Sequence, residues 1–244
     1  MVVTDKELPV SGGAEKRAYV RGIFTAIAPR YDLLNHLLSL NIDKRWRRSA
    51  VAELGWESVP AGTYLDLCAG TLDLAAALGN HPGFGGRVVG ADFVKPMLER
   101  GRDKSAAVVP VTADALELPF PDRAFDGATV GFGVRNLMDL DGGLREAARV
   151  LKPGARLVIL EFTTPPRQPM RGMYFFYFRR ILPLIGRLIS KHRDAYTYLP
   201  ESVLAFPEPP ELAAKMEQAG FGAVKVKLLL GGICAIHAGV RQDR

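Results

Sequence analysis

Acidic residues and a loop with one glycine follow the apolar runs in the first half of the sequence, where a parallel sheet would place a ligand. The first run ends in LDLCAGTLD (residues 65–73), the second at Asp92 and the third at Asp114. Ligands of parallel sheets bind beyond the carboxyl ends of the strands, so we expect these residues to lie close together. Asp92 stands 22 residues after Gly70, a separation that lets a carboxylate hydrogen-bond the ribose hydroxyls of adenosine. The pattern predicts a site for an adenosine-containing ligand.

The residues around Gly70 distinguish between two such ligands, NAD and S-adenosylmethionine. A pyrophosphate needs several glycines so that it can approach the loop backbone and the helix that follows. The segment AGTLDL offers one glycine, with Leu72 where bare backbone is needed and Asp73 adding negative charge at the helix start. S-adenosylmethionine carries no phosphate and has a cationic sulfonium. The loop therefore favours S-adenosylmethionine.

Short apolar runs that alternate with helical stretches predict the elements that position these residues. Five runs predict a parallel sheet built from βαβ units: TYLDLC, RVVGAD, AVVPVTAD, FDGATVGFG and RLVILEF. Two further runs, AVKVKLLL and ICAIHAGV, are joined by Gly231 and Gly232 and predict an antiparallel hairpin. Helical spacing over residues 17–54 predicts added N-terminal helices. The expected fold is α/β and Rossmann-like, with a mostly parallel sheet of seven strands.

Length and composition fit one α/β domain. The chain has 244 residues, 48% of them hydrophobic, which is enough to bury a large core. We expect a flexible N-terminal tail over residues 1–16 and one domain over 17–244, which includes a helical, basic insertion at 165–200. The two cysteines, Cys68 and Cys234, are far apart, so neither a disulfide framework nor a metal site is indicated. No N-terminal apolar run resembles a signal peptide, and we expect a cytoplasmic location.

The positive charge of the chain is concentrated between Pro165 and Arg193. Seven basic residues and no acidic ones lie there, and without them the net charge of +6 becomes −1. Because the remainder is nearly neutral, no nucleic-acid-binding surface is expected. Apolar residues of this segment recur at helical spacing, but no run approaches the roughly 20 residues that span a bilayer. The insertion either contacts anionic headgroups on the inner face of the cell membrane or caps the active site.

Longer motifs extend over nearly the whole chain, namely YDLLNHLLSLNIDKRWRR, LPFPDRAFDGATVGFGVRN, RVLKPGARLVILEF and AYTYLPESVLAFP. In these motifs the sequence resembles the ubiquinone/menaquinone biosynthesis C-methyltransferases, which methylate a ring carbon of a polyprenylated quinol. The resemblance implies a class I S-adenosylmethionine-dependent methyltransferase fold, with cofactor contacts at Gly70, Thr71, Asp92, Asp114 and Ala115. Two positions depart from the family's pattern, since Leu72 replaces a small residue and Gly131 a frequent serine.

Methyl transfer to such a ring requires a nucleophilic carbon, because the cofactor already supplies an electrophilic methyl group. Only the reduced quinol provides a nucleophilic carbon, when its hydroxyl group loses a proton. The pKa of that hydroxyl is about 10, as in tyrosine. In the FGVRN motif, Arg135 is predicted to stabilise the phenolate and Asn136 to orient the ring. A guanidinium stays protonated, so the proton acceptor is left open among water, His36 and His192.

A further group of side chains is expected to line a pocket for the quinol head: Tyr31, Asp32, Asn35, Tyr196 and Tyr198. The predicted function is S-adenosylmethionine-dependent C-methylation of a polyprenyl quinol, with demethylmenaquinol converted to menaquinol. Three alternatives are benzoquinol methylation in the ubiquinone pathway, a non-catalytic lipid-quinol-binding protein with an impaired cofactor loop, and an NAD-linked oxidoreductase. The sequence leaves open whether the chain forms a homodimer.

Overall fold

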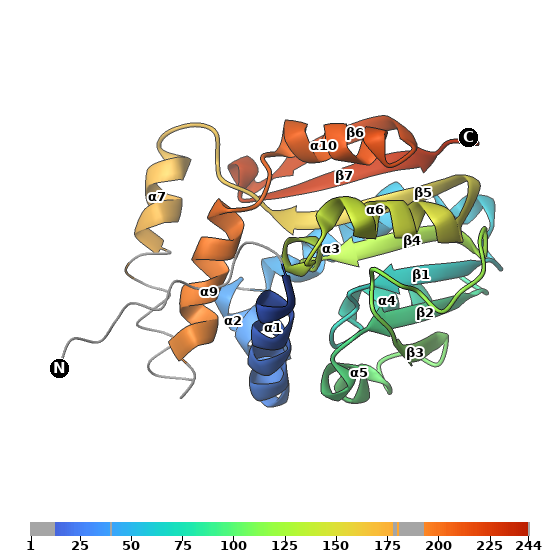
Figure 1. The fold of residues 1–244 in the computed structure, drawn as a ribbon, viewed down its shortest axis with the longest axis horizontal. Coiled ribbons are helices and arrows are strands. Elements are labelled where there is room, and N and C mark those ends of the chain that lie inside the picture. The colour runs from blue at the N-terminus through green and yellow to red at the C-terminus, as the bar shows by residue number, and fades with distance from the viewer. Residues whose placement is uncertain (1–12, 40, 178–179, 181–192, 244) are drawn as a thin grey trace.

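A seven-stranded sheet with helices on both faces forms the centre of the molecule (Figure 1). The fold is that of a computed structural model, which describes residues 13–39, 41–177, 180 and 193–243. The strands are β1 (Thr63–Leu67), β2 (Arg87–Asp92), β3 (Val108–Thr112), β4 (Phe125–Gly131), β5 (Leu151–Phe162), β6 (Phe221–Leu229) and β7 (Cys234–Arg241). They lie in the order β3-β2-β1-β4-β5-β7-β6.

The strand pairing is parallel except at the C-terminal edge. β1 pairs in parallel with both β2 and β4, whereas β7 pairs antiparallel with both β5 and β6. Between β6 and β7, Gly231 and Gly232 have φ values of 66° and 94°, a conformation that glycine adopts without steric cost. The predicted mostly parallel sheet of seven strands and its antiparallel hairpin are confirmed.

The chain changes direction in the sheet beside β1. It runs from β1 through β2 to β3 at one edge and then returns to β4 on the other side of β1. The loops after β1 and β4 therefore lead away from each other, which opens a crevice at the carboxyl ends of these strands. This is the place where the sequence predicted a ligand.

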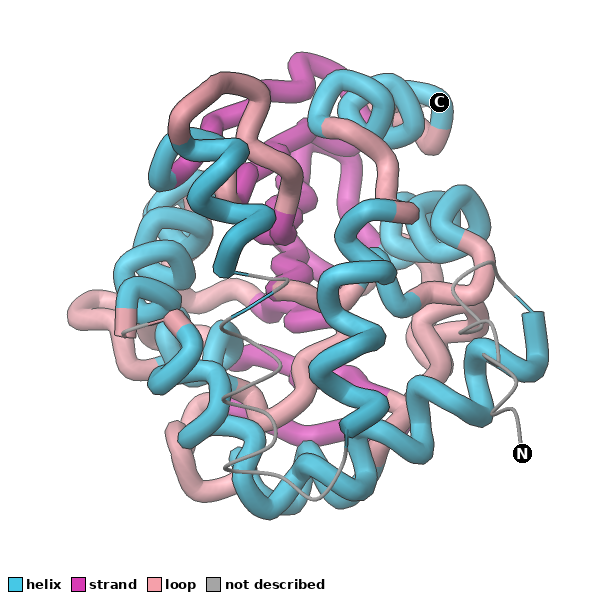
Figure 2. Tube along the Cα trace, turned by 90° about the vertical axis from the view of Figure 1, so that its left-hand side faces the viewer, coloured by secondary structure: helices cyan, strands magenta, loops and turns pink. Residues whose placement is uncertain are grey.

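Two cores lie on the two faces of the sheet, because alternate residues of a strand point to opposite faces. In β5, Leu157 and Ile159 belong to one core, whereas Val158 and Leu160 belong to the other. The first core lies under α6 (Leu140–Val150) and α10 (Pro209–Gln218), and the second under α3 (Ile42–Leu54), α4 (Asp73–Gly79) and α5 (Lys95–Gly101). Figure 2 shows the strands enclosed between these helices.

A further group of helices lies beyond the carboxyl ends of the parallel strands, where the arrows of β4 and β5 point in Figure 1. They are α1 (Gly13–Ile27), α2 (Tyr31–Leu38), α7 (Met170–Phe176) and α9 (Arg193–Leu204). Short 3-10 helices connect several elements, namely η1 (Ala28–Arg30), η2 (Trp56–Ser58), η3 (Val134–Asn136) and η5 (Leu230–Gly232). These N-terminal and inserted helices cover the crevice end of the sheet.

Helix α1 begins earlier than the sequence suggested, so the predicted tail boundary at residue 16 falls inside a helix. Lys16 is only 5% exposed, because its ammonium group donates hydrogen bonds to the backbone oxygens of Arg135 and Leu137. Those partners lie 119 and 121 positions further along the chain, and the local sequence carries no sign of them. Residues 1–12, 178–179 and 181–192 lie outside the described residues, and with them the centre of the insertion predicted at 165–200.

Candidate active site

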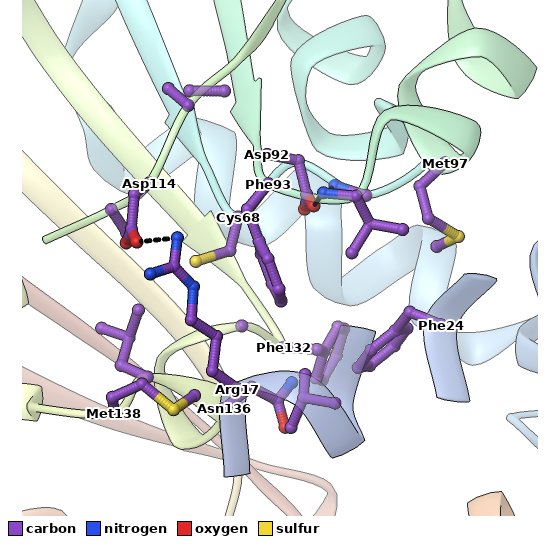
Figure 3. A pocket seen from close by; sticks show the side chains of 18 of the residues that line it. Arg17, Phe24, Cys68, Asp92, Phe93, Met97, Asp114, Phe132, Asn136 and Met138 are labelled. Carbon is purple, nitrogen blue, oxygen red and sulfur yellow. Dashed lines mark hydrogen bonds and ion pairs between the residues drawn. The ribbon is translucent and has the colours of Figure 1, made fainter. Parts of the chain in front are cut away.

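A cleft of about 730 Å³, part of it open to solvent, lies where the loops after β1, β2, β3 and β4 face α1 (Figure 3). Four predicted cofactor residues line it, namely Gly70, Asp92, Asp114 and Ala115. Two residues predicted for substrate binding and catalysis, Tyr31 and Asn136, line it as well. The sequence thus predicted most of the polar residues of one continuous cleft.

The Asp92 carboxylate connects β2 to the loop after β1. One of its oxygens accepts the Gly70 N–H at 2.9 Å and the other accepts the Val94 N–H at 2.8 Å. Burial raises the pKa of Asp92, while these two hydrogen bonds lower it. Each carboxylate oxygen has a second lone pair, so the group can hold the loop and still accept hydrogen bonds from ribose hydroxyls.

The loop after β1 is a tight turn with three residues in left-handed conformations. Cys68, Gly70 and Leu72 have φ values of 54°, 52° and 64°. Leucine is disfavoured there, at a cost of roughly 1–2 kcal/mol, but its side chain is fully buried in the core. A Cβ at Gly90 would clash with the Leu72 Cδ2 atom, so this glycine makes the space that leucine fills. A Cβ at Gly101 would clash with the Thr71 backbone oxygen, so that glycine makes room for the loop itself. Our interpretation of Leu72 as an obstacle facing the ligand is therefore wrong, because its side chain points into the core.

Asp73 lies in a network of charges beside the loop. Its carboxylate contacts the Lys104 ammonium at 2.5 Å and the Arg47 guanidinium at 3.3 Å. Lys104 also pairs with Asp32 at 2.7 Å, and Asp32 accepts a hydrogen bond from the Thr71 hydroxyl at 2.5 Å. Two cations thus compensate Asp73, so our argument that its charge repels a phosphate is wrong. The structure places Thr71 and Asp32 in this network and outside the main cleft.

Arg47 is a buried cation that the sequence analysis did not single out. Its side chain is 10% exposed, pairs with Asp43 one turn earlier in α3, and lies 5.8 Å from the centre of the Phe132 ring. A second, smaller cavity is lined by Arg47 together with Asp66 and Thr71. Its sequence context is the pattern RWRR, in which Trp46 is buried as well.

S-adenosylmethionine has a nucleoside end and a zwitterionic amino-acid end, and the two cavities offer partners for both. Asp92 is suited to the ribose, and Arg47 is suited to the carboxylate of the amino acid. The cavities share Tyr31, Cys68, Gly70 and Gly131, so one ligand can occupy both. Among the described residues, no three His, Cys, Asp or Glu side chains gather to hold a metal ion.

Arg17 of α1 extends across the cleft and pairs with Asp114 at 2.7 Å, as the dashed line in Figure 3 shows. Asp114 also accepts the Leu116 N–H at 3.0 Å, so its carboxylate is oriented from two sides. The arginine was not expected from the sequence, because α1 is remote from β3 along the chain. Its position makes α1 one wall of the cleft.

Arg135 forms a buried ion pair with Glu161 of β5. Its guanidinium donates to the Glu161 carboxylate at 2.7 Å and to the Phe132 backbone oxygen at 2.6 Å, and the two charged side chains are 7% and 2% exposed. Burial lowers the pKa of Arg135, but the Glu161 carboxylate together with Tyr31 and Tyr198 raises it above its ordinary value, so the guanidinium stays charged. Arg135 itself does not line the cleft, and Glu161 was missed by the sequence analysis.

The remaining residues predicted to bind the substrate are Tyr198, Asn35 and Tyr196, and their surroundings differ. Tyr198 is buried, and its hydroxyl donates to the Asn136 side-chain oxygen at 3.1 Å. Asn35 hydrogen-bonds Tyr31, whose pKa burial raises. The side chain of Tyr196 lies outside the described residues, as do those of the two candidate proton acceptors, His36 and His192.

Comparison with known sequences decides the class of the protein. The ubiE/COQ5 methyltransferase family matches residues 13–241. The chain belongs to this family. A demethylmenaquinone methyltransferase of Thermus thermophilus is 52% identical over 223 residues, which are 90% of this chain and 100% of the relative. A ubiquinone/menaquinone biosynthesis C-methyltransferase of a Geobacter species is 44% identical over 234 residues, which are 93% of this chain and 98% of the relative.

Solved structures agree with this assignment at the level of the fold. An S-adenosylmethionine-dependent methyltransferase of Thermotoga maritima superposes with a TM-score of 0.62 at 19% identity, covering 91% of this chain and 99% of that one. The class I methyltransferase fold is thereby confirmed. The chain is an S-adenosylmethionine-dependent C-methyltransferase, so the NAD-linked alternative is wrong.

We predict that Asp92→Ala weakens cofactor binding by roughly 10- to 100-fold, the range that corresponds to one hydrogen bond with a charged group. The variant loses both the ribose acceptor and the Gly70 N–H partner. Titration calorimetry with S-adenosylhomocysteine measures the effect, and Glu99→Ala, an exposed acid on α5, is the matched control. Unchanged affinity in a folded Asp92→Ala variant would contradict the assignment.

Proposed function

We propose that this methyltransferase transfers a methyl group from S-adenosylmethionine to a ring carbon of a polyprenylated quinol, converting demethylmenaquinol to menaquinol. The observation that carries the proposal is the 52% identity to a demethylmenaquinone methyltransferase over 100% of that relative. Benzoquinol methylation is the second candidate, favoured by the 44% identity to a relative named for both quinone pathways.

The lining of the cleft suits an aromatic, largely apolar substrate. Phe24, Phe93, Phe132 and Met138 contribute apolar surface to it, and Phe93 lies next to Asp92 (Figure 3). Planar rings pack well against such side chains. Polar contacts there are few, which is the usual composition of a small-molecule site.

The η3 turn provides the groups that act on the quinol hydroxyl. The cofactor, when bound, supplies the electrophilic methyl group. Asn136 faces the cleft with its side chain fixed by Tyr198, and it is suited to orient the hydroxyl. Arg135 lowers the pKa of the hydroxyl through its charge, which Glu161 partly offsets. The Nε atom of Arg135 is buried and has no hydrogen-bond partner among the described residues.

The proposed reaction is tested by methyl incorporation from labelled S-adenosylmethionine. We expect product with reduced demethylmenaquinone, less with the reduced benzoquinol analogue, and none with either oxidised quinone, because only the quinol can form a phenolate. Binding of S-adenosylhomocysteine is measured in parallel. Cofactor binding without product from either quinol would contradict the proposed reaction. Quinol binding without binding of S-adenosylhomocysteine would favour the non-catalytic lipid-quinol-binding alternative. A preference for the benzoquinol would reverse the order of the two candidate substrates.

We predict that Arg135→Gln lowers kcat at least tenfold, a loss of about 1.4 kcal/mol in transition-state stabilisation. The loss should ease as pH rises, because a higher pH supplies phenolate without help from the guanidinium. Initial rates with reduced quinol across pH measure this, with Arg87→Gln, an exposed arginine at the start of β2, as the control.

A second variant separates this role from folding. Arg135→Gln leaves Glu161 buried without its partner, which destabilises proteins by roughly 3–5 kcal/mol. Adding Glu161→Gln removes that charge, so the double variant should regain thermal stability but not turnover. Recovery of kcat together with the melting temperature would mean that Arg135 has only a structural role.

We propose that the basic insertion brings the enzyme to an anionic membrane surface, where a prenylated substrate would lie. On α7, Met173 and Phe176 are 61% and 62% exposed. The exposed arginines Arg167, Arg171 and Arg180 lie in the same segment. Such a combination of apolar and cationic side chains is typical of contact with the interfacial region of a membrane. No helix among the described residues is long and apolar enough to cross a bilayer.

We predict that the Met173→Ser, Phe176→Ser double variant binds anionic vesicles several-fold more weakly than the parent, since two apolar anchors are lost. Co-sedimentation with phosphatidylglycerol vesicles measures binding, and neutral phosphatidylcholine vesicles should retain little protein. Val109→Ser, which changes an exposed apolar residue of β3, is the control. Equal sedimentation of parent and double variant would indicate instead that the insertion only caps the active site.

A further inference from the structure

Lys16 is a buried lysine that the reaction described above does not use. Its ammonium group lies 3.1 Å from the backbone oxygen of Arg135 and 2.9 Å from that of Leu137. These two carbonyls stand on either side of Asn136. Burial and the nearby Arg135 charge both lower the pKa of Lys16. Burying the charged ammonium group costs free energy unless the two carbonyl oxygens compensate its charge.

The turn that Lys16 contacts has few hydrogen bonds of its own. Within it, the Asn136 N–H donates to the Gly133 oxygen at 3.0 Å and the Leu137 N–H donates to the Val134 oxygen at 3.2 Å. The carbonyls at the end of a short helix have no partner inside that helix. Lys16 donates to the Arg135 oxygen, in the peptide group before Asn136, and to the Leu137 oxygen, in the peptide group between Leu137 and Met138. It therefore fixes the chain on both sides of Asn136.

Two further contacts place α1 beside the same turn. Tyr19, one turn after Lys16, packs edge-on against Tyr198 with ring centres 5.7 Å apart. Tyr198 in turn donates its hydrogen bond to Asn136. Arg17, the neighbour of Lys16, pairs with Asp114 on the opposite wall of the cleft. The first turns of α1 therefore hold both the η3 turn and the cofactor wall.

We propose that Lys16 is a positioning residue for methyl transfer, whose ammonium group fixes the η3 turn so that Asn136 presents its amide to the substrate. This inference rests on the proposed function of the Arg135–Asn136 turn. Lys16 lies on the N-terminal helix and was not among the predicted catalytic or cofactor-binding residues. A cation that bonds two backbone oxygens controls the turn without contacting the reacting atoms.

The test compares Lys16→Met with the parent, because methionine keeps the length and apolar stem of lysine but lacks its donors. We expect kcat to fall roughly 30-fold, about 2 kcal/mol at 1.4 kcal/mol per factor of ten, while the KM for the cofactor changes less than about twofold, since the ammonium contacts neither ligand. Lys16→Arg retains a cationic donor and should recover part of the lost kcat. Arg21→Met, which removes an exposed cation from the same helix, should leave both constants unchanged.

Hydrogen exchange separates this inference from the proposed function. In Lys16→Met, the amides of residues 133–138 should exchange faster than in the parent, whereas those of β1 should not change. If the parent methylates neither quinol, the proposed function fails, yet the exchange measurement still decides whether Lys16 fixes the turn. Parental exchange at 133–138 would overturn the inference. So would a parental kcat in Lys16→Met, or a defect that Lys16→Arg shares in full.

Discussion

The hydrogen bond from the Gly70 N–H to the Asp92 carboxylate is the interaction on which the rest of the site depends. It joins the ends of β1 and β2, next to the crevice between β1 and β4 where the strand order of the sheet reverses. The loop it holds turns tightly through three left-handed residues and connects directly to α4. The Ala69 N–H adds a second bond to β2, at 3.0 Å from the Ala91 oxygen, and the buried Leu72 side chain anchors the same loop.

Charged side chains in this enzyme have partners far along the chain, and these contacts help determine how the outer helices meet the sheet. Lys16 bonds the η3 turn, Arg17 pairs with Asp114, and Arg135 pairs with Glu161. A buried charge without a partner costs several kcal/mol, so the contacts of the buried Lys16 and Arg135 restrict how their elements can be arranged. Arg17, whose side chain is 55% exposed, adds a weaker contact. Helix α1 is held in this way against both walls of the cleft.

The fold and the cofactor side of the site could be predicted from local patterns. Alternating apolar runs indicated the sheet, and Asp92 stood out through its distance from Gly70. The orientation of side chains was harder to predict. Leu72 and Asp73 look like ligand-facing residues in sequence, but the left-handed backbone at Leu72 directs its side chain into the core, and Lys104 and Arg47 compensate Asp73.

Charged residues with distant partners were missed altogether. Lys16, Arg17, Arg47 and Glu161 acquire their roles from contacts with residues far along the chain or on another strand, and no local spacing marks them. Where the sequence did indicate Arg135, it predicted a charge acting on the substrate. The structure adds that Glu161 shares this charge and that Arg135 lies behind the cleft lining.

We infer that the crevice between β1 and β4 binds an adenosine-containing cofactor without a pyrophosphate. Titration of the full chain with S-adenosylhomocysteine and with NAD, followed by calorimetry, tests it most directly. We expect one S-adenosylhomocysteine to bind per chain and NAD to give no heat of binding. Tight binding of NAD, or no binding of S-adenosylhomocysteine to the folded protein, would contradict it.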